Sequence, residues 1–203
     1  MHNELFQLLL SGKIGDGSFV NQRKTENKTY RYCTNSICKD YIDHKKLVCD
    51  KYGLSTVYEL NKYSGYIPNK QLYAFRTKVH NETTIVGNMT TEEVLQQLDK
   101  LGLIYYYLDD GSLHKHKHFM HLYCNNFTSN QAEMLADIIE KFYPQKRCTV
   151  RYEHKKDGRV FAVIYIPVIV AKEFSKDVRD FLERHQITSL LYKTIPFEYK
   201  INE

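Results

Sequence analysis

The pattern of apolar and polar positions divides the 203-residue chain into two successive series of helices and strands. The first series begins with residues 4–14, where leucines recur at helical spacing until Gly15-Asp16-Gly17, a segment that favours a turn. Strand-like residues 18–22 and 29–34 follow, and the basic loop between them indicates a hairpin.

The rest of the first series repeats this helix-then-hairpin order. Ser36 is in position to cap a helix that begins near Ile37, carries one apolar stripe and ends at Gly53. Strands are predicted at 54–60 and 71–78, so the order is α-ββ-α-ββ. Residues 80–89 are interpreted as a loop, and 90–98 as a capped helix that links the two series.

The second series has the same order. A helix that ends at Leu108 leads through Asp110 and a polar turn to a strand, and Thr128 with Gln131 forms a capping box for the next helix. Strands are predicted at 148–154 and 160–167 around Asp157-Gly158, a dipeptide common in tight hairpin turns. A last helix is predicted from Val168 to Arg184, and the first half looks trimmed because it lacks one. The sequence therefore predicts an α+β fold with a duplicated α-ββ-α-ββ(-α) pattern.

A short phrase occurs at the same place in both series. The first copy is Gly15-Asp16-Gly17-Ser18 and the second is Asp109-Asp110-Gly111-Ser112, with the second aspartates 110 − 16 = 94 residues apart. Two such helices packed side by side would bring both carboxylates to one point. We predict an N-terminal half at 1–89, a linker helix at 90–100 and a C-terminal half at 101–203.

Composition narrows the class of protein. The chain has 29 Lys+Arg against 24 Asp+Glu, a net charge of +5 and a pI near 8.8, which favours a polyanionic partner. Five cysteines without a C-x-x-C pair favour reduced thiols inside a cell. The longest apolar run, 160–171, is too short to cross a bilayer, and the N-terminus lacks the layout of a signal peptide. We expect an intracellular protein with no membrane partner, acting in the cytoplasm or nucleoid of a bacterium or phage-infected cell, or in an organelle matrix.

Paired aspartates suit one kind of chemistry. Mg²⁺ prefers carboxylate oxygens, keeps several waters and takes further ligands from substrate phosphates, and Mn²⁺ accepts similar ligands. The pair therefore favours metal-assisted hydrolysis of a phosphodiester bond. Gly12 and Gly15 are expected to let the first helix approach the second closely. The alternative is that each Asp-Gly is only a turn after a helix, with the acids acting as helix caps.

These residues resemble the LAGLIDADG homing endonucleases, specifically the single-chain type resembling intron-encoded mitochondrial members. The copies are Leu9-Leu10-Ser11-Gly12-Lys13-Ile14-Gly15-Asp16-Gly17 and Leu103-Ile104-Tyr105-Tyr106-Tyr107-Leu108-Asp109-Asp110-Gly111. The segment Leu191-Tyr192-Lys193-Thr194-Ile195-Pro196 is similar to the part of that family that carries an active-site lysine. The resemblance implies two antiparallel sheets that form a DNA-binding saddle, and a monomer that cuts both strands of a long, nearly asymmetric duplex site.

The resemblance also implies roles for individual residues. Asp16 and Asp110 would bind Mg²⁺ or Mn²⁺, helped by the backbone carbonyls of Gly15 and Asp109, and Lys193 would stabilise charge or position water. Lys78 is the nearest candidate for the equivalent lysine of the first half. Lys13 and Tyr105 depart from the usual small or apolar residues of the motif helix.

Basic residues near the predicted strands and turns have their own interpretation. Arginines can make bidentate contacts to guanine, and lysines contact the phosphate backbone. Arg151, Glu153 and Lys155 should share one strand face, with Val150 and Tyr152 on an apolar one. The alternative is that charged hairpin tips only solvate or protect strands. The predicted DNA-binding residues are Arg23, Lys24, Lys28, Arg31, Lys62, Lys70, Arg76, Lys78, Lys115, Lys117, Arg147, Arg151, Lys155, Lys156 and Arg159.

Rival interpretations stay open at this point. The same scaffold could serve as an RNA maturase that binds intron RNA, or as a nucleic-acid-binding protein that does not cleave. The histidines at 114, 116, 118 and 121 admit a zinc site, but no cysteine or carboxylate spacing completes one, and DNA-facing or solvated histidines are favoured.

Overall fold

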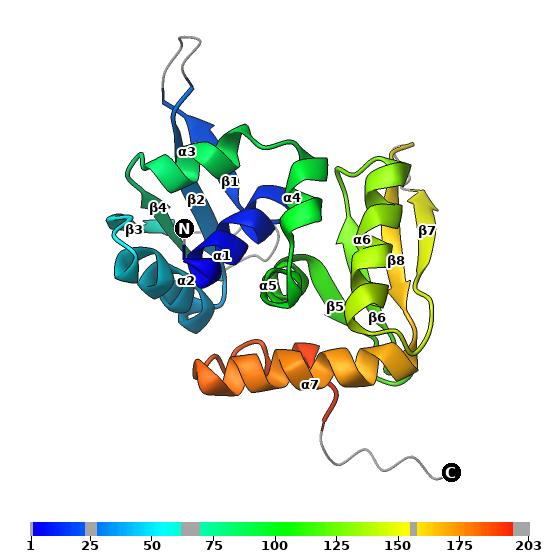
Figure 1. The fold of residues 1–203 in the computed structure, drawn as a ribbon. Helices are drawn as coiled ribbons and strands as arrows, with labels where there is room; N and C mark the ends of the chain where they lie inside the picture. The colour runs from blue at the N-terminus through cyan, green and yellow to red at the C-terminus, as the bar shows by residue number, and fades with distance from the viewer. Residues whose placement is uncertain (1, 23–27, 62–69, 155–157, 197–203) are drawn as a thin grey trace. The chain divides into compact units, whose positions relative to one another are not determined.

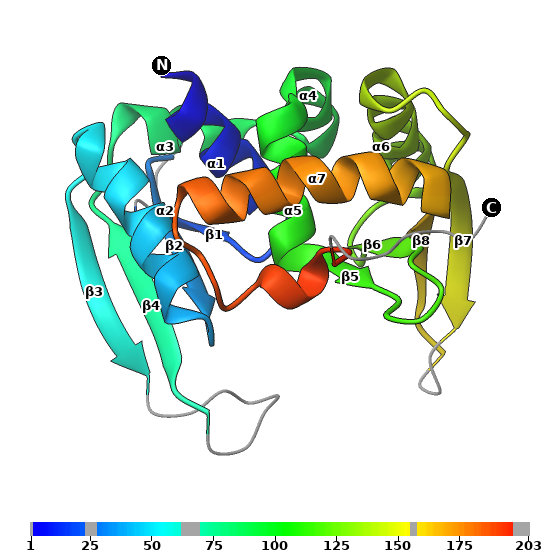
Figure 2. The ribbon, with the colours of Figure 1, turned by 90° about the horizontal axis from the view of Figure 1, so that it is seen from below.

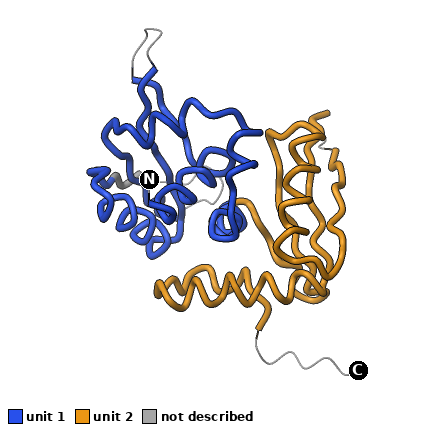
Figure 3. The backbone as a smooth tube through the Cα atoms, in the orientation of Figure 1, with its two compact units in different colours: residues 1–109 blue, residues 110–203 orange. Residues whose placement is uncertain are grey.

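A computed structural model describes residues 2–22, 28–61, 70–154 and 158–196, with no side-chain description at 59–61. The chain forms two compact units, residues 1–109 and 110–203, which are coloured separately in Figure 3. Each unit carries one four-stranded antiparallel sheet.

In unit 1, helices precede, separate and follow the strands along the chain, as shown from blue to green in Figure 1. Its strands pair in the order β1-β2-β4-β3, and each neighbouring pair is antiparallel. The elements are α1 (Asn3–Ile14), β1 (Ser18–Asn21), β2 (Tyr30–Ser36), α2 (Lys39–Lys51), β3 (Thr56–Asn61), β4 (Leu72–Thr77), α3 (Asn81–Asn88), α4 (Thr91–Gln97) and α5 (Lys100–Asp110, whose last residue opens unit 2).

The prediction of a loop over 80–89 is wrong, because α3 occupies this segment. Its residues have low intrinsic helix propensity, so sequence alone favours a loop. Contacts with β2 decide the outcome: the Thr83 hydroxyl donates to the Tyr30 carbonyl at 2.6 Å, and the Tyr30 N–H donates to the Thr84 hydroxyl at 3.2 Å. The first half is therefore not trimmed, since α3 follows its second hairpin.

The start of α2 also differs from the prediction. The N-cap residue is Cys38, which makes no side-chain cap, and Ser36 belongs to β2. The Ser36 hydroxyl still accepts a hydrogen bond from the Cys38 N–H at 3.1 Å. Register explains the shift, because Ser36 pairs with Tyr73 and this pairing extends the strand by two residues beyond the predicted end.

Unit 2 repeats the sheet order as β5-β6-β8-β7, with antiparallel neighbours throughout. Helix α6 begins with the predicted capping box of Thr128 and Gln131, and α7 has the predicted bounds. The α+β class and the duplicated order are confirmed. The elements are β5 (Gly111–Leu113), β6 (Met120–Cys124), α6 (Ser129–Phe142), β7 (Thr149–His154), β8 (Val160–Ile166), α7 (Val168–Arg184) and the short 3₁₀ helix η1 (Leu191–Lys193).

One face of each sheet is covered by helices and the other is open. In unit 1, α2 packs on β4 and β2, while in unit 2 α6 packs on β8 and β7. The ring centre of Tyr143, the residue directly after α6, lies 5.3 Å from that of Phe174 of α7, so α7 extends the same apolar layer. The covered face of each sheet thus forms the core, and the open face is left to carry recognition.

The packing units differ from the predicted halves in one respect: α5, the second motif helix, clusters with unit 1. Compactness and internal repetition are separate properties, so the division into 1–89, 90–100 and 101–203 stays a prediction. Among the described residues, no helix combines the length and the apolar character needed to cross a membrane.

All five cysteines lie in described parts of the chain, and none forms a disulfide. Four of them are buried, while Cys33 is half-buried on the open face of the first sheet. Burial raises the pKa of Cys49 and of Cys148 to about 12, with smaller contributions from the neighbouring Asp50 and Glu140.

Candidate functional site

The first motif ends in a tight approach between a helix and a strand. A Cβ atom on Gly12 would lie 2.6 Å from the Tyr32 ring, and one on Gly17 would lie 2.5 Å from the Gly12 carbonyl oxygen. Gly12 therefore leaves room for the ring of Tyr32 of β2. The helix ends at Ile14 with Gly15 as its C-cap, and Asp16 is exposed just before β1.

The second motif places its acid differently. Helix α5 continues through Asp110, two residues beyond the predicted end at Leu108, and Gly111 begins β5 directly. Asp110 is half-buried, and its Oδ2 atom is shielded from solvent. The second acid is thus held by helical backbone on one side and by a paired strand on the other.

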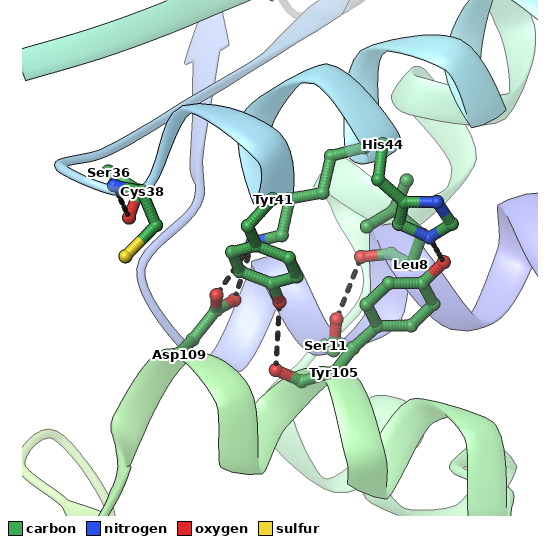
Figure 4. A network of polar contacts seen from close by, with 9 residues as sticks. Leu8, Ser11, Ser36, Cys38, Tyr41, His44, Tyr105 and Asp109 are labelled. Carbon is green, nitrogen blue, oxygen red and sulfur yellow. Dashed lines mark hydrogen bonds and ion pairs between the residues drawn. The ribbon is translucent and has the colours of Figure 1, made fainter. Parts of the chain in front are cut away.

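A buried ion pair fixes the residue before Asp110. Lys45 of α2 donates from Nζ to both carboxylate oxygens of Asp109, at 2.7 and 2.9 Å (Figure 4). The two side chains are only 1% and 3% exposed, so each charge depends on the other for compensation. Because the Asp109 side chain is committed to Lys45, the metal-binding prediction for Asp109 concerns its backbone carbonyl.

Polar rings surround this ion pair. The Tyr41 hydroxyl donates to the Tyr105 carbonyl at 3.3 Å, and His44 Nε2 lies 2.8 Å from the Tyr105 hydroxyl (Figure 4). Lys45 Nζ lies 4.4 Å from the centre of the Tyr41 ring, a cation–π distance. Burial, followed by the Asp109 charge, raises the pKa of Tyr41, and burial, followed by Glu4, raises the pKa of Tyr105. Both phenols therefore stay protonated and neutral.

Sequence reasoning missed this network, although a signal was available. Lys45 lies within the apolar stripe of α2, between Tyr41 and the pair Val48 and Cys49. A lysine on a buried face needs a charged partner. The partner could not be identified from sequence because it lies 64 residues away.

Lys193 lies close to the strand that follows the second acid. It ends η1, a short helix that packs beside β5 within unit 2 (Figure 2). Lys193 is buried at 8% exposure, and its N–H donates to the Leu190 carbonyl at 2.9 Å. The structure therefore brings the segment of Lys193 and the strand that begins after Asp110 together.

The first half offers no matching buried lysine at Lys78, which is exposed just after β4. Lys13 is engaged inside unit 1, where its Nζ donates to the Gly87 carbonyl at 2.8 Å in the last turn of α3. Burial lowers the pKa of Lys13. The departure of Lys13 from the motif thus has a packing role, since it ties α1 to α3.

The predicted DNA-binding residues fall into three groups. Arg31, Arg76 and Arg151 belong to strands, and the register places them on the open faces of their sheets. Exposed residues at strand ends or turns are Lys28, Lys70, Lys78, Lys115, Lys117, Arg147 and Arg159, of which Arg147 lies 3.6 Å from Glu140. Arg23, Lys24, Lys62, Lys155 and Lys156 lie outside the described residues.

The predicted alternation along β7 is confirmed, because Val150 and Tyr152 lie opposite the buried Ile164 and Ala162, while Arg151 lies on the open face. Tyr152 is 47% exposed and Val150 is half-buried, because β7 is an edge strand of its sheet. Sequence reasoning also missed the aromatic character of the open face in unit 2, where His121, Tyr123 and Tyr165 stand close together. Alternation along β6 and β8 was the signal that could have identified it.

The four histidines near β6 do not form a metal-sized cluster in the described chain. His114 Nδ1 accepts a hydrogen bond from the Lys117 N–H at 3.1 Å, which closes the turn. The predicted metal ligands are instead oxygen atoms, namely the carboxylates of Asp16 and Asp110 and the carbonyls of Gly15 and Asp109. This donor chemistry fits Mg²⁺ or Mn²⁺ and does not fit the softer ligand sets of zinc.

Comparison with known protein families shows which family the chain belongs to. The family model described as the LAGLIDADG DNA endonuclease family matches residues 9–174, which confirms the resemblance seen in the two motif copies. No curated protein sequence matches the chain closely enough to show a relationship.

Solved structures share the fold at low sequence identity. The homing endonuclease I-WcaI bound to its DNA recognition sequence matches with a TM-score of 0.67 and 18% identity, covering 96% of this chain and 87% of its own. I-DmoI in complex with DNA and Ca matches with a TM-score of 0.61 and 15% identity, covering 86% and 88%. The N-terminal LAGLIDADG domain of DUF199/WhiA matches with a TM-score of 0.53 and 11% identity, covering 96% and 84%.

Proposed function

The chain belongs to the LAGLIDADG DNA endonuclease family and is a site-specific DNA endonuclease, and we propose that Asp16 and Asp110 are its metal-binding acids. The observation that carries this proposal is their equivalent position. Each acid stands between a motif helix and the first strand of a sheet, and the two sheets have the same strand order.

We infer that the metal is Mg²⁺, for which Mn²⁺ can substitute. I-DmoI has been solved in complex with DNA and Ca, in complex with DNA and Mn, and as a variant in complex with its target DNA in the presence of Mg. In this chain Asp16 and Asp110 would hold the ion, with the carbonyls of Gly15 and Asp109 beside them. A divalent ion supplies activation of water and stabilisation of the leaving oxygen.

The chain's own residues then have distinct tasks. Asp16 and Asp110 supply negative charge that offsets the cation, and the ion pair of Lys45 with Asp109 keeps the backbone before Asp110 in place. We propose that Lys193 stabilises the charge that develops on the scissile phosphate, since an oriented cation at that point lowers the barrier. The open sheet faces bind the duplex and hold the phosphate in position.

Cleavage of a duplex library tests the proposal. Purified protein, Mg²⁺ and duplexes with randomised inserts should give cut products with one shared sequence, and chelation should abolish cutting. Asp16→Asn and Asp110→Asn should each reduce the cutting rate by more than ~100-fold, because a metal ligand is lost. Asp43→Asn, which removes an exposed acid of α2, is the matched control. Cutting that survives both motif substitutions would overturn the assignment.

Lys193 is tested separately. Lys193→Met should lower the rate of cutting by ~100-fold or more and leave DNA binding nearly unchanged, as expected for a group that acts in the transition state. Lys176→Met, which removes an exposed lysine of α7, controls for lost charge. Equal loss of binding and cutting would instead assign Lys193 to substrate binding.

We also propose that the substrate is a long, nearly asymmetric duplex, bound by a monomer inside the cell or organelle that carries its target. Footprinting gives the length of the protected site, and light scattering of the complex gives the number of chains. Intron RNA stays an alternative partner: splicing of a host intron that is supported equally well by Asp110→Asn protein would establish that role.

A further inference from the structure

The open face of the first sheet carries two arginines among mixed apolar and polar residues. The register aligns Arg31 opposite Val20, and Arg76 opposite Cys33 on one side and Val57 on the other. Asn35 follows on the same face, opposite Ala74. No acidic residue stands directly across from either arginine in these described strands. Both arginines therefore lie on the open face of the first sheet.

Arg31 carries an unsatisfied donor. Its Nε is buried and makes no hydrogen bond to any described residue. A buried guanidinium donor in this state carries a free-energy cost. Arginine matches the O6 and N7 acceptors of guanine with two parallel hydrogen bonds.

The open face of the second sheet has a different chemistry. Phe119 lies 5.0 Å from His121 and 5.1 Å from Tyr165, measured between ring centres. His121 in turn lies 6.2 Å from Tyr123. Rings from the segment before β6, from β6 itself and from β8 thus form one continuous aromatic surface. We call Phe119, His121, Tyr123 and Tyr165 the aromatic face.

One arginine belongs to this surface, and its position is constrained. The Arg151 guanidinium lies 4.2 Å from the centre of the Tyr165 ring, a cation–π stack that orients its donors. Burial lowers the pKa of His121, with Arg151 and His114 adding to the effect and Glu153 opposing it. The imidazole is therefore uncharged at pH 7.

We propose that the two half-sites of the DNA target differ in base composition: the first sheet reads guanines through Arg31 and Arg76, and the aromatic face packs against thymine methyl groups. Arg151 contributes a single guanine contact to the second half-site. The inference rests on the proposed function, because it requires each open face to enter a major groove. Direct contact with the C5-methyl group is how apolar side chains recognise thymine.

Binding selection tests the inference without cleavage. The full chain in EDTA is incubated with randomised duplexes, and the bound fraction is sequenced. One half of the consensus should carry two guanine positions, and the other should be rich in A·T pairs with thymine at the contacted positions. Arg31→Ala and Arg76→Ala should each weaken preference at one guanine by ~5- to 100-fold. His121→Ala and Tyr123→Ala should alter only the opposite end.

Deoxyuridine provides a test that leaves the protein untouched. Replacing thymine by deoxyuridine removes only the methyl group, so each contacted position in the second half-site should lose about 4-fold in affinity. The same replacement in the first half-site should have no effect. Arg184→Ala, which removes an exposed arginine at the end of α7, controls for lost charge, and melting curves confirm that every variant folds.

The outcomes separate the two proposals. Failure to bind any duplex would overturn the proposed function. Selection of a site with guanines equally in both halves, or loss of preference at the same end for Arg76→Ala and His121→Ala, would overturn only the base assignment. Affinity that is unchanged by deoxyuridine in both halves would overturn the methyl contact.

Discussion

The two motif copies distribute side-chain volume in opposite ways between helix and strand. In the first copy the helix supplies Gly12 and the facing strand supplies the large ring of Tyr32. Aligning the copies on Gly17 and Gly111 makes Tyr106 the counterpart of Gly12, and the strand registers make Met120 the counterpart of Tyr32. In the second copy the tyrosine therefore belongs to the helix, whereas in the first copy it belongs to the strand.

This exchange explains why the halves share an architecture with little residue identity. Packing density must be preserved, but in each half the large side chain can come from either the helix or the strand. The support of the acids differs as well, since Asp16 is exposed beyond the end of its helix and Asp110 follows an aspartate locked to Lys45. Duplication therefore conserves the positions of the acids and leaves their surroundings free to diverge.

Removing the buried lysine should have the largest effect. Lys45→Met leaves the Asp109 carboxylate buried without its cation, which should lower the free energy of unfolding by about 3–5 kcal/mol. Urea unfolding followed by circular dichroism measures the loss. Lys46→Met, at the partly exposed neighbour paired with Asp50, should cost less than about 1 kcal/mol. The double variant Lys45→Met with Asp109→Leu should regain most of the stability, and no recovery would contradict the account of a charge left unpaired.

Filling the space beside Tyr32 should have the next largest effect. Gly12→Ala places a methyl group 2.6 Å from the Tyr32 ring and should cost about 1–3 kcal/mol through overpacking. The double variant Gly12→Ala with Tyr32→Met moves the volume distribution of the first copy toward that of the second. Its unfolding midpoint should lie above that of Gly12→Ala alone. A lower midpoint would show that the two positions are not exchanging volume.

A cap distinguishes the equivalent helices α6 and α2. Thr128 accepts a hydrogen bond from the Gln131 N–H at 3.3 Å, while Cys38 at the start of α2 makes no side-chain cap. Thr128→Ala should therefore cost about 1 kcal/mol. Ser129→Ala, at the exposed first helical residue, should be nearly neutral. Thermal unfolding of both variants provides the comparison, and equal effects would remove the cap from the explanation.

Acidification should have the smallest effect on stability, and this effect should arise at His121 on the open face of the second sheet. The folded protein binds a proton at His121 more weakly than the unfolded chain does, because the pKa of His121 is lowered. Stability present above pH 6.5 is therefore lost as the pH falls through that lowered pKa. His121→Gln should reduce the slope of melting temperature against pH between about 7.5 and 5.5, because the group with the lowered pKa is then missing. An unaltered slope in His121→Gln would exclude this residue as the source.

Local chemistry made much of the fold predictable from sequence. The capping box at Thr128, the strand alternation and the bounds of α7 all depend on residues close together in the chain. Elements fixed by distant contacts were missed, as for α3, which is held by hydrogen bonds between Thr83, Thr84 and Tyr30. The partners of Lys45 and of Gly12 belong to the same class, since both lie on other elements.

The five cysteines differ in burial, and burial determines how readily each thiol reacts. Cys49 and Cys148, with pKa values of about 12, remain protonated and resist alkylating reagents at neutral pH. Cys33 alone among the five is half-buried, and it stands opposite Arg76 on the first sheet. A maleimide fluorophore would therefore attach mainly at Cys33, on the open face of the first sheet. Its emission would report binding of a ligand to that face, and the protein would need no engineered cysteine.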